Sequence, residues 1–463
     1  MNLNDLKKIY FLGIGGIGMS ALARYFNKKG VEIHGYDKTK TPLTRRLAKE
    51  GMHIHYDENT GFIPPDIDLA IWTPAVPRDH KAFEWFAQHN VPLKKRAEVL
   101  GMISRSHRTI AVAGTHGKTT TSSLIAHLLH VGGVDATAFL GGIAQNFDSN
   151  FVAGKGEWVV AEADEYDRSF LQLSPEIAVL LSMDADHLDI YGDAGSVAET
   201  GFKEFIKKTK PSGKVFIKHN LAQNFDNQLF DIAEGGRKEV DGITFSTFGL
   251  EKGAYRSENI RVENGWFVFD FVAPVAEPSW EAKTEPGNRN GRDGGRSYGE
   301  VRLGNLRLGM PGRHNVENAT AAIAVALQLG VSPLAIRKAL LTFKGIKRRF
   351  EIVYRDEKVV FIDDYAHHPT EIQSAVQAAR ELFPGRSITG IFQPHLFTRT
   401  RDFQEGFAEE LDKLDHVILL DIYPAREEPI PGITSEVIFE KLENPSPVSN
   451  DNLARFMPTF PKP

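Results

Sequence analysis

The sequence predicts an α/β protein of three domains built on parallel sheets. Apolar strands alternate with helical patterns along much of the 463 residues, glycine-bearing turns follow two of these strands, and several later strands end in polar clusters. The expected domains are a Rossmann-like domain at 1–106, a central P-loop domain with an added small β part at 107–345, and a C-terminal Rossmann-like domain at 346–463.

Composition excludes several functional classes. The chain is 41% hydrophobic and 25% charged, and its formal net charge is -5. It therefore lacks the basic field that nucleic acid or an anionic membrane would require. It has no cysteine, which excludes disulfides and thiolate metal sites, and no apolar run long enough to span a bilayer. We expect a cytoplasmic protein that binds neither nucleic acid nor membrane.

A glycine-rich turn between a strand and a helix is the first motif. Its glycines are Gly13, Gly15, Gly16 and Gly18, and Asp37 follows at the end of the second strand. This dinucleotide fingerprint lets a diphosphate approach the backbone and places a carboxylate for a ribose hydroxyl. The surrounding residues superficially resemble a signal peptide, but the glycines favour a nucleotide turn. The motif leaves open whether the ligand is NAD or another nucleotide.

The segment after this turn continues the α/β alternation. We expect a strand at 69–73, a helix at 81–89, and a hinge at 92–108 that leads into the second domain.

Residues 109–122 form a predicted phosphate-binding loop. An apolar strand breaks at Gly114 and Gly117 and meets Lys118 and Thr119 at the head of a helix, although Val112 stands where the full motif has its first glycine. Backbone N–H groups and the positive helix end cradle phosphates, the lysine adds charge, and the threonine hydroxyl can ligate Mg²⁺. The residues expected at ATP are Gly114, Thr115, His116, Gly117, Lys118, Thr119 and Thr120.

Two acidic clusters follow later strands of this domain. One runs from Glu162 to Asp167 and the other, which contains His187, from Asp184 to Asp189. Because the carboxyl ends of parallel strands meet at one edge of a sheet, both clusters should face the phosphate loop. Carboxylate and imidazole beside a triphosphate suit Mg²⁺, with Mn²⁺ as a substitute, so Glu162 and His187 are the expected metal ligands beside Thr119.

The rest of the central domain is predicted to turn to β-structure. Strands are expected at 215–217, 243–248, 265–271 and 301–308, with a mobile, non-catalytic loop or hairpin tip at 277–300. An apolar helix follows and runs to Leu329. Asn315 and Asn318 at its start are open to two interpretations, helix capping or ligand binding.

Three strands of the third domain end in polar residues. They lie at 359–362, 388–392 and 417–420, and a helix is expected to start at Pro369 or Thr370. His367 and His368 could hold a metal, but adjacent side chains do not share a helix face, so substrate binding or a structural role is favoured.

Taken together, these motifs resemble the Mur ligase family over about residues 8–440. The motifs that carry the resemblance are GIGGIGMS, AGTHGKTTT, EADEYD, DADHLD, PGRHNVENA, GIKRRFE, DDYAHHPTE and QPHLFTRTRD, in this order. The match is closest to the members that join L-alanine to the lactyl carboxylate of UDP-N-acetylmuramate at the expense of ATP, through an acyl phosphate. The resemblance implies monomers or weak homodimers and a role in cytoplasmic peptidoglycan precursor synthesis.

The resemblance also implies roles for single residues. The N-terminal glycines and Asp37 would bind the UDP-sugar. Lys118, Thr119, Glu162 and His187 would act at ATP phosphates and metal. The remaining implied positions are His314, Asn315, Asn318, Arg349 and Asp364 at the nucleotide, and His395 and Arg399 at the amino acid. Lys118, His187, Arg349 and His395 would be catalytic, with His187 or His395 accepting the proton of the amine.

Two departures keep alternatives open. Leu396 stands where many relatives carry Arg, and the chain stops at Pro463 without the final strand and helix usual in the family. The third domain would then lack an edge. The alternatives are a ligase of the same family that attaches a murein tripeptide, a catalytically impaired relative, and an NAD-dependent oxidoreductase, which would leave the Lys118 loop without a use.

Overall fold

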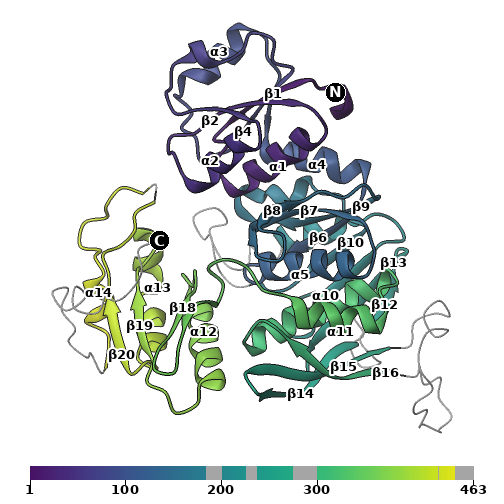
Figure 1. The fold of residues 1–463 in the computed structure, drawn as a ribbon, viewed down its shortest axis with the longest axis vertical. Coiled ribbons are helices and arrows are strands. Elements are labelled where there is room, and N and C mark those ends of the chain that lie inside the picture. Colours follow the sequence, from purple (N-terminus) through teal and green to yellow (C-terminus); the bar gives the residue numbers. More distant parts are fainter. Residues whose placement is uncertain (184–200, 226–236, 275–299, 426, 444–463) are drawn as a thin grey trace. The chain divides into compact units, whose positions relative to one another are not determined.

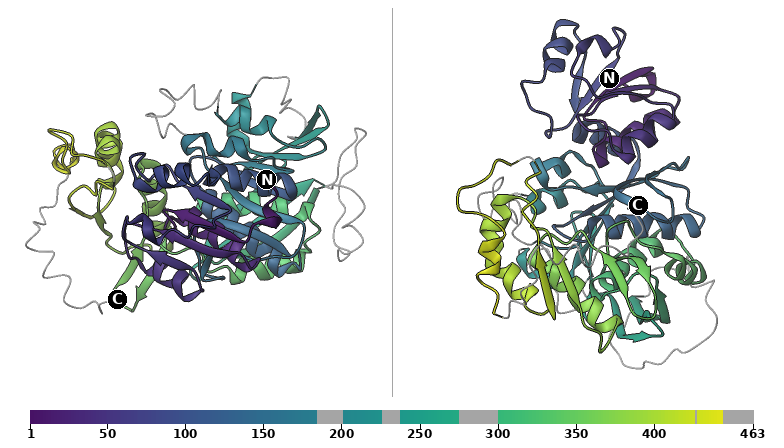
Figure 2. Two further views of the ribbon diagram at one scale, coloured as in Figure 1. Left: turned by 90° about the horizontal axis from the view of Figure 1, so that it is seen from above. Right: turned by 60° about the vertical axis from the view of Figure 1, so that its left-hand side comes forward.

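The computed structural model describes residues 1–183, 201–225, 237–274, 300–425 and 427–443. Contacts divide the chain into two compact units. The larger unit comprises Met1–Arg261, Val268–Gly309 and Asn315–Lys347, and the smaller comprises Val262–Phe267, Met310–His314 and Arg348–Pro463. Strands and helices alternate in both units, which confirms the predicted α/β class (Figures 1 and 2).

The larger unit begins with a five-stranded parallel sheet of order β3-β2-β1-β4-β5. Side chains alternate between its faces: Ile9 and Phe11 pack into one core with helices α1 and α4, and Tyr10 and Leu12 pack into another with Phe86 of α3. The elements are β1 (Lys8–Leu12), α1 (Ile17–Lys28), β2 (Glu32–Tyr36), α2 (Pro42–Lys49), β3 (His53–His55), β4 (Leu69–Trp72), α3 (Lys81–Gln88), β5 (Leu93–Lys95) and α4 (Arg96–Ser106).

The hinge predicted at 92–108 is wrong, because this segment forms β5 and α4. The Glu98 carboxylate accepts a hydrogen bond of 2.6 Å from the backbone N–H of Lys95, which closes the helix start. Val99, Leu100 and Ile103 are buried at helical spacing. That spacing was the available signal for a helix.

A second sheet, with 11 strands among the described residues, follows the first. Its strand order is β16-β15-β14-β13-β11-β10-β6-β9-β7-β8, with β12 paired to β13, and β6 lies between β9 and β10 in parallel. The strands are β6 (Arg108–Ala113), β7 (Ala136–Ala144), β8 (Ser149–Val152), β9 (Trp158–Ala163), β10 (Ile177–Leu180), β11 (Lys214–Lys218), β12 (Arg237–Val240), β13 (Ile243–Leu250), β14 (Tyr255–Glu263), β15 (Trp266–Pro274) and β16 (Glu300–Leu308).

Helices α5 (Lys118–Val131), α8 (Lys203–Lys207), α10 (Arg313–Gln328) and α11 (Pro333–Thr342) accompany this sheet. The strands expected at 215–217, 243–248, 265–271 and 301–308 are confirmed as β11, β13, β15 and β16. Strands β7, β8, β12 and β14 were not predicted from the sequence. Of the loop expected at 277–300, residues 277–299 lie outside the described residues, and Glu300 begins β16.

A buried polar side chain joins strand β8 of the second sheet to helix α1, which packs on the first sheet. Asn150 on β8 is fully buried and donates from its amide to the Ser20 hydroxyl at 2.9 Å and to the backbone carbonyl of Ile17 on α1. Its carbonyl accepts from Arg24, whose guanidinium also bonds Glu50 at 2.8 Å. All polar groups of this amide therefore have partners at the α1–β8 contact.

The smaller unit holds two short strand pairs. β17 (Glu351–Arg355) and β18 (Val360–Asp363) are antiparallel, whereas β19 (Thr389–Phe392) and β20 (His416–Leu419) are parallel. The three predicted strands are present, but within the described residues β18 pairs with β17 and not with β19. The helices are α12 (Pro369–Leu382), α13 (Phe397–Leu411) and α14 (Glu436–Phe439). Residues 444–463, where the sequence led us to expect a shortened terminus, lie outside the described residues.

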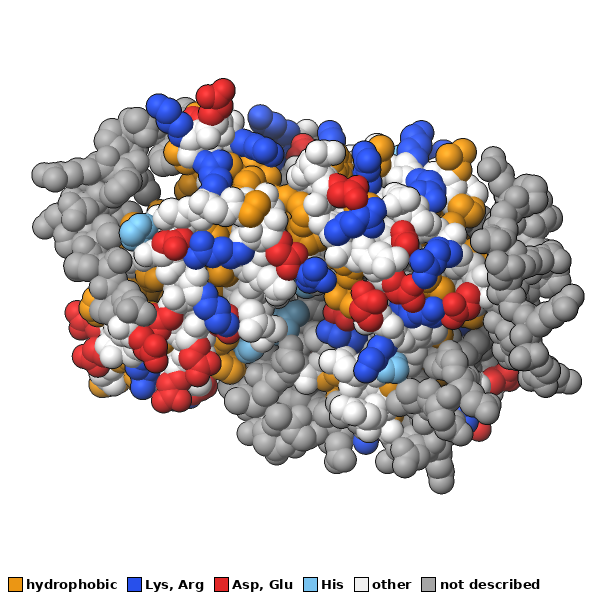
Figure 3. Space-filling view, turned by 90° about the horizontal axis from the view of Figure 1, so that it is seen from below, with side chains coloured by type: hydrophobic (Ala, Val, Ile, Leu, Met, Phe, Trp, Pro, Cys, Tyr) orange, Lys and Arg blue, Asp and Glu red, His pale blue; other side chains and the backbone are white. Residues whose placement is uncertain are grey.

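The described surface agrees with the charge balance of the sequence. On the face drawn in Figure 3, the described basic side chains are interspersed with acidic ones and form no continuous basic surface. No described helix combines the length and the apolar character that a membrane span requires.

We expect Asn150→Ala to lower the free energy of unfolding of the larger unit by about 1–3 kcal/mol, because it leaves buried partners on α1 without their hydrogen bonds. Denaturant unfolding followed by circular dichroism measures the change. Gln88→Ala, which removes only an exposed bond to Glu84, is the matched control and should change stability by at most about 0.5 kcal/mol. Equal stability of both variants would contradict a structural role for the Asn150 network.

Candidate active site

The N-terminal glycine turn is held by Asp37. The Asp37 carboxylate accepts a 2.7 Å hydrogen bond from the backbone N–H of Gly15 and a 3.0 Å bond from that of Thr39. A Cβ atom at Gly15 would lie 2.6 Å from the same carboxylate, so any larger residue there would displace Asp37 from the turn. Gly13 has a φ of 89° and Gly16 is the N-cap of α1. The strand, turn and helix expected here are confirmed, and the contact of Asp37 with a ribose stays a prediction.

Arg96 is a residue of this region that the sequence reasoning missed. A Cβ atom at Gly18 would lie 2.7 Å from the Arg96 guanidinium, so the arginine lies against the first turn of α1. The same guanidinium is 3.5 Å from the carboxylate of Asp164, which follows β9. Arg96 therefore extends from the N-terminal turn toward the acidic cluster of the second sheet.

The phosphate loop connects β6 to α5. Gly117 has a φ of 81° and is the N-cap of the helix that begins at Lys118, so the first N–H groups of α5 point out of the helix end. The Ser182 hydroxyl accepts a 2.8 Å bond from the N–H of His116 and bonds the hydroxyl of Thr115 at 2.9 Å. Gly114, which has a φ of 139°, directly precedes Thr115 and His116. Thr120 is buried in the first turn of α5.

The Lys118 ammonium makes an ion pair with Glu165. Its Nζ atom lies 2.9 and 2.7 Å from the two Glu165 carboxylate oxygens and 2.6 Å from the carbonyl oxygen of Gly114. Burial lowers the pKa of Lys118, but the carboxylates, Glu165 foremost, outweigh it, so the net shift is upward and the ammonium stays charged. Glu165 could not be assigned from the sequence, because an acidic run after a strand does not show which carboxylate points toward the loop.

Glu162 on β9 offers an oxygen environment suited to a divalent cation. Its carboxylate accepts from the hydroxyls of Thr119 and Ser122, each at 3.1 Å, and from the N–H of Gly141 at 2.5 Å. Burial raises the pKa of Glu162 despite these donors and Lys118. A carboxylate and a threonine hydroxyl side by side fit the ligand preference of Mg²⁺. His187, the other predicted ligand, lies outside the described residues.

The start of α10 lies beside the phosphate loop. A Cβ atom at Gly117 would lie 2.6 Å from the side-chain oxygen of Asn318, whose amide donates to Asn315 at 3.3 Å. Because α10 begins at Arg313, neither asparagine is its N-cap residue. The two asparagines belong to the group of side chains around the loop.

A second group of predicted residues gathers in the smaller unit. The Arg349 guanidinium lies 3.3 Å from Glu371, and the Asp364 carboxylate accepts 2.7 Å bonds from the N–H groups of Phe350 and Ala366. Burial raises the pKa of Asp364. Burial also lowers the pKa of His314 to about 4, against the attraction of Glu371. Glu371 was not singled out from the sequence, although it lies in the DDYAHHPTE motif.

His395 lies in an aromatic and imidazole cluster of the same unit. Its ring centroid is 5.5 Å from that of Tyr423 and 6.2 Å from those of Tyr365 and His367. Arg399 is buried on α13. His368 is the N-cap of α12, since its ring accepts from the N–H of Thr370 at 3.3 Å.

Leu396, the residue that departs from the family pattern, has a φ of 74° and precedes α13. Its carbonyl oxygen accepts from the Thr400 hydroxyl at 2.8 Å, and its N–H donates to Tyr423 at 2.9 Å. A leucine with positive φ is strained and persists only where its surroundings fix it. The backbone next to His395 is therefore held in a set conformation.

Comparison with protein families matches nearly the whole chain. Residues 8–108 match the catalytic domain of the Mur ligase family, residues 112–326 the Mur ligase middle domain, and residues 348–457 the Mur ligase glutamate ligase domain.

Individual relatives match over similar lengths. A UDP-N-acetylmuramate–L-alanine ligase of Flavobacterium johnsoniae is 46% identical over 96% of this chain and 90% of its own, and one of Parabacteroides distasonis is 45% identical over the same shares. The crystal structure of a UDP-N-acetylmuramate–alanine ligase from Thermotoga maritima has a TM-score of 0.72 at 30% identity and covers 94% of this chain and 87% of its own. A murein peptide ligase from Psychrobacter arcticus has a TM-score of 0.65 at 25% identity, over 94% and 88%. Matching domains in order and relatives of this identity over almost the full length establish that the chain belongs to the Mur ligase family.

Proposed function

We propose that the chain joins L-alanine to the lactyl carboxylate of UDP-N-acetylmuramate and converts ATP to ADP and phosphate in cytoplasmic peptidoglycan precursor synthesis. The observation that carries the proposal is the convergence of Lys118, Thr119 and Glu162 at one helix N-terminus, in a chain that matches L-alanine ligases over almost its full length. The N-terminal turn around Gly15 is the proposed seat of the UDP diphosphate, because glycines there allow close backbone approach.

The first step makes the carboxylate reactive. The lactyl carboxylate attacks the γ-phosphorus of ATP, and the bond between this phosphorus and the bridging oxygen breaks. ADP departs, and the lactyl carboxylate has become an acyl phosphate. Lys118 holds phosphate oxygens by exchanging its partner Glu165 for them, and the N–H groups at the start of α5 add positive potential. Thr119, Glu162 and His187 would hold Mg²⁺, and the ion would supply positive charge against the phosphate oxygens.

The second step forms the amide. The amine of L-alanine attacks the acyl carbon, and phosphate leaves from the tetrahedral intermediate. We assign His395 and Arg399 to the amino acid, Arg349 to the charge on the phosphoryl group, and His314 and Asp364 to the nucleotide. The amine must lose a proton before it attacks, so an imidazole acceptor has to be neutral. His187 and His395 are the two candidates for this acceptor.

The competing function is attachment of a murein tripeptide to the same UDP-sugar. The similarity to the murein peptide ligase of Psychrobacter arcticus is the observation that favours it. Release of phosphate from ATP separates the two. We expect release that requires both UDP-N-acetylmuramate and L-alanine. Release with L-alanyl-γ-D-glutamyl-diaminopimelate but not with L-alanine would replace the proposed function by the tripeptide activity, and no release with either would support an impaired relative.

Lys118→Ala should lower the rate of phosphate release by at least about 10²–10³-fold, because it removes the side-chain charge at the transferring group. The assay is steady-state turnover with both substrates and ATP. Lys338→Ala, which changes an exposed lysine on α11, should keep the full rate. Full turnover of Lys118→Ala would show that the phosphate loop is assigned wrongly.

His314 should stay neutral down to about pH 4, because burial lowers its pKa from the ordinary value of 6.5 to about 4. Its imidazole resonances, assigned by their loss in His314→Asn, report this in an NMR titration. The His314 imidazole binds a proton less readily in the folded state than in the unfolded state. Protonation of His314 therefore lowers the free energy of unfolding as the pH drops from about 6.5 to about 4. His314→Asn should therefore show a shallower loss of stability over this range. A resonance that titrates near 6.5 would contradict the burial argument.

A further inference from the structure

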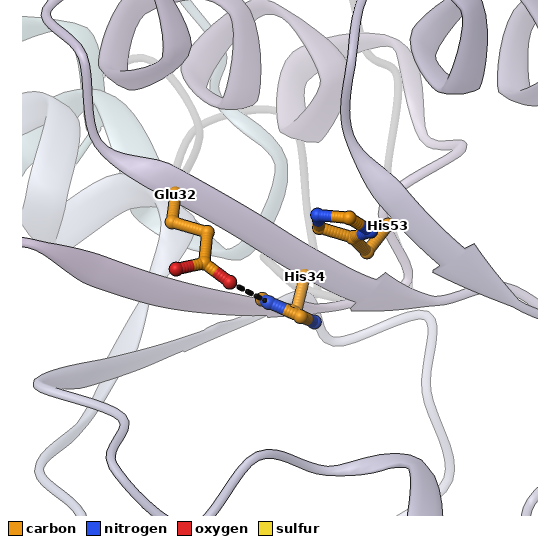
Figure 4. A group of neighbouring side chains, drawn as sticks. All are labelled: Glu32, His34 and His53. Atoms are coloured by element: carbon orange, nitrogen blue, oxygen red, sulfur yellow. Dashed lines mark hydrogen bonds and ion pairs between the residues drawn. The ribbon is translucent and has the colours of Figure 1, made fainter.

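Three metal-ligating side chains gather on the edge of the N-terminal sheet, outside the candidate active site. Glu32 and His34 lie on β2, and His53 lies on the edge strand β3 (Figure 4). β2 and β3 are parallel, and His34 is the register partner of His53. Because side chains alternate along a strand, Glu32 and His34 lie on the same face. The pairing therefore brings all three together.

The distances between these side chains suit one shared cation. Candidate ligand atoms of the three residues all lie within 4.8 Å of one another, and a His34 ring nitrogen is 2.6 Å from a Glu32 carboxylate oxygen. The rings of His34 and His53 stack with centroids 4.6 Å apart. Ligands of a tetrahedral zinc ion, at bond lengths of about 2.0–2.2 Å, lie about 3.3–3.6 Å apart. Small rotations of the exposed Glu32 and His53 side chains toward the half-buried His34 ring would bridge this difference.

The donor set favours zinc over the hard cations. Two imidazoles and one carboxylate, with a further position left to water, are a common zinc ligand set, whereas Mg²⁺ and Ca²⁺ prefer oxygen ligands alone. Within the described residues, this is the one group of three histidine or acidic side chains with such spacing.

The surrounding charges leave the Glu32 carboxylate available. Lys8 on the neighbouring strand lies 3.5 Å from one oxygen of Glu32, but it is closer to Asp66, at 2.8 Å. The bond to His34 uses the other oxygen of Glu32. Two carboxylates face one ammonium here, so the local charge is negative and attracts a cation.

The cluster lies apart from the nucleotide turn. Glu32 is the first residue of β2. At the other end of this strand, the backbone carbonyl oxygen of Tyr36 accepts hydrogen bonds from the N–H groups of Gly13 and Ile14, at 2.9 and 3.0 Å. Glu32 and Tyr36 are four residue steps apart along an extended strand, which is about 13 Å. An ion at Glu32 would therefore not touch the nucleotide turn.

We propose that Glu32, His34 and His53 bind one Zn²⁺ ion, which fastens the edge strand β3 to β2. β3 has three residues and, among the strands that the structure describes, pairs with β2 alone. A ligand that binds the folded chain alone stabilises it. Bound zinc therefore slows opening of β3.

The test is zinc titration of the full chain by calorimetry, with excess Mg²⁺ present to occupy the proposed catalytic metal site. Wild type should bind one Zn²⁺ that His53→Ala and His34→Ala each weaken by at least about tenfold, since even loss of an outer-shell partner costs that much. His89→Ala, which removes an exposed histidine of the same domain, should bind as wild type does. Circular dichroism of the zinc-free variants checks that they are folded.

Two further measurements locate the ion. Zinc should slow amide exchange at residues 53–55 in wild type and not in His53→Ala. With Cu²⁺ in place of zinc, electron paramagnetic resonance should show nitrogen couplings that His34→Ala and His53→Ala reduce. Zinc affinity, stoichiometry and exchange protection that are the same in wild type and His53→Ala would overturn the proposal. So would zinc binding that excess Mg²⁺ abolishes.

Discussion

The parallel pairing of β6 with β9 and β10 is the constraint on which the predicted phosphate site depends. In its register Val112 lies opposite Glu162, and Ala113 lies opposite Leu180. The chain leaving β6 therefore turns beside a carboxylate from β9 and the hydroxyl of Ser182 after β10. A shift of one residue would move Glu162 to the other face of the sheet and separate it from Thr119.

Charge compensation follows from this pairing. Lys118 and Glu165 form an ion pair at the carboxyl ends of the parallel strands. The Glu162 carboxylate accepts hydrogen bonds from three donors. Isolated buried charges are costly, so each needs a partner in the folded chain. The ion pair keeps the lysine charged and beside the helix end. The phosphates proposed to bind there must therefore compete with Glu165, and this competition connects folding stability with nucleotide binding.

The two ends of strand β2 in the N-terminal sheet have different roles. The last residue of β2 supports the glycine turn, and Asp37 directly after it fixes the conformation of that turn. The first residue of β2 belongs to the cluster with His34 and His53. Between them, Ile33 packs into the core shared with α1. α1 in turn contacts β8 through the Asn150 network, so the glycine turn that precedes α1 is supported by helix packing that continues into the second sheet.

Local signals in the sequence were enough for much of the fold. The glycine turn, the phosphate loop with its helix, and the apolar strands after residue 213 have spacings that local backbone chemistry dictates, and the motif order indicated the family. Residues 92–108 are the exception: Pro92 and the polar residues after it favour a hinge, whereas Val99, Leu100 and Ile103 have the helical spacing that the structure confirms.

Other features depend on contacts between distant segments, which no local pattern encodes. Only the tertiary structure decided that Lys118 pairs with Glu165, that Asn318 lies against Gly117, and that Arg96 contacts the first turn of α1. In the same way, the sequence separates Glu32 and His34 from His53, and strand register alone brings them together.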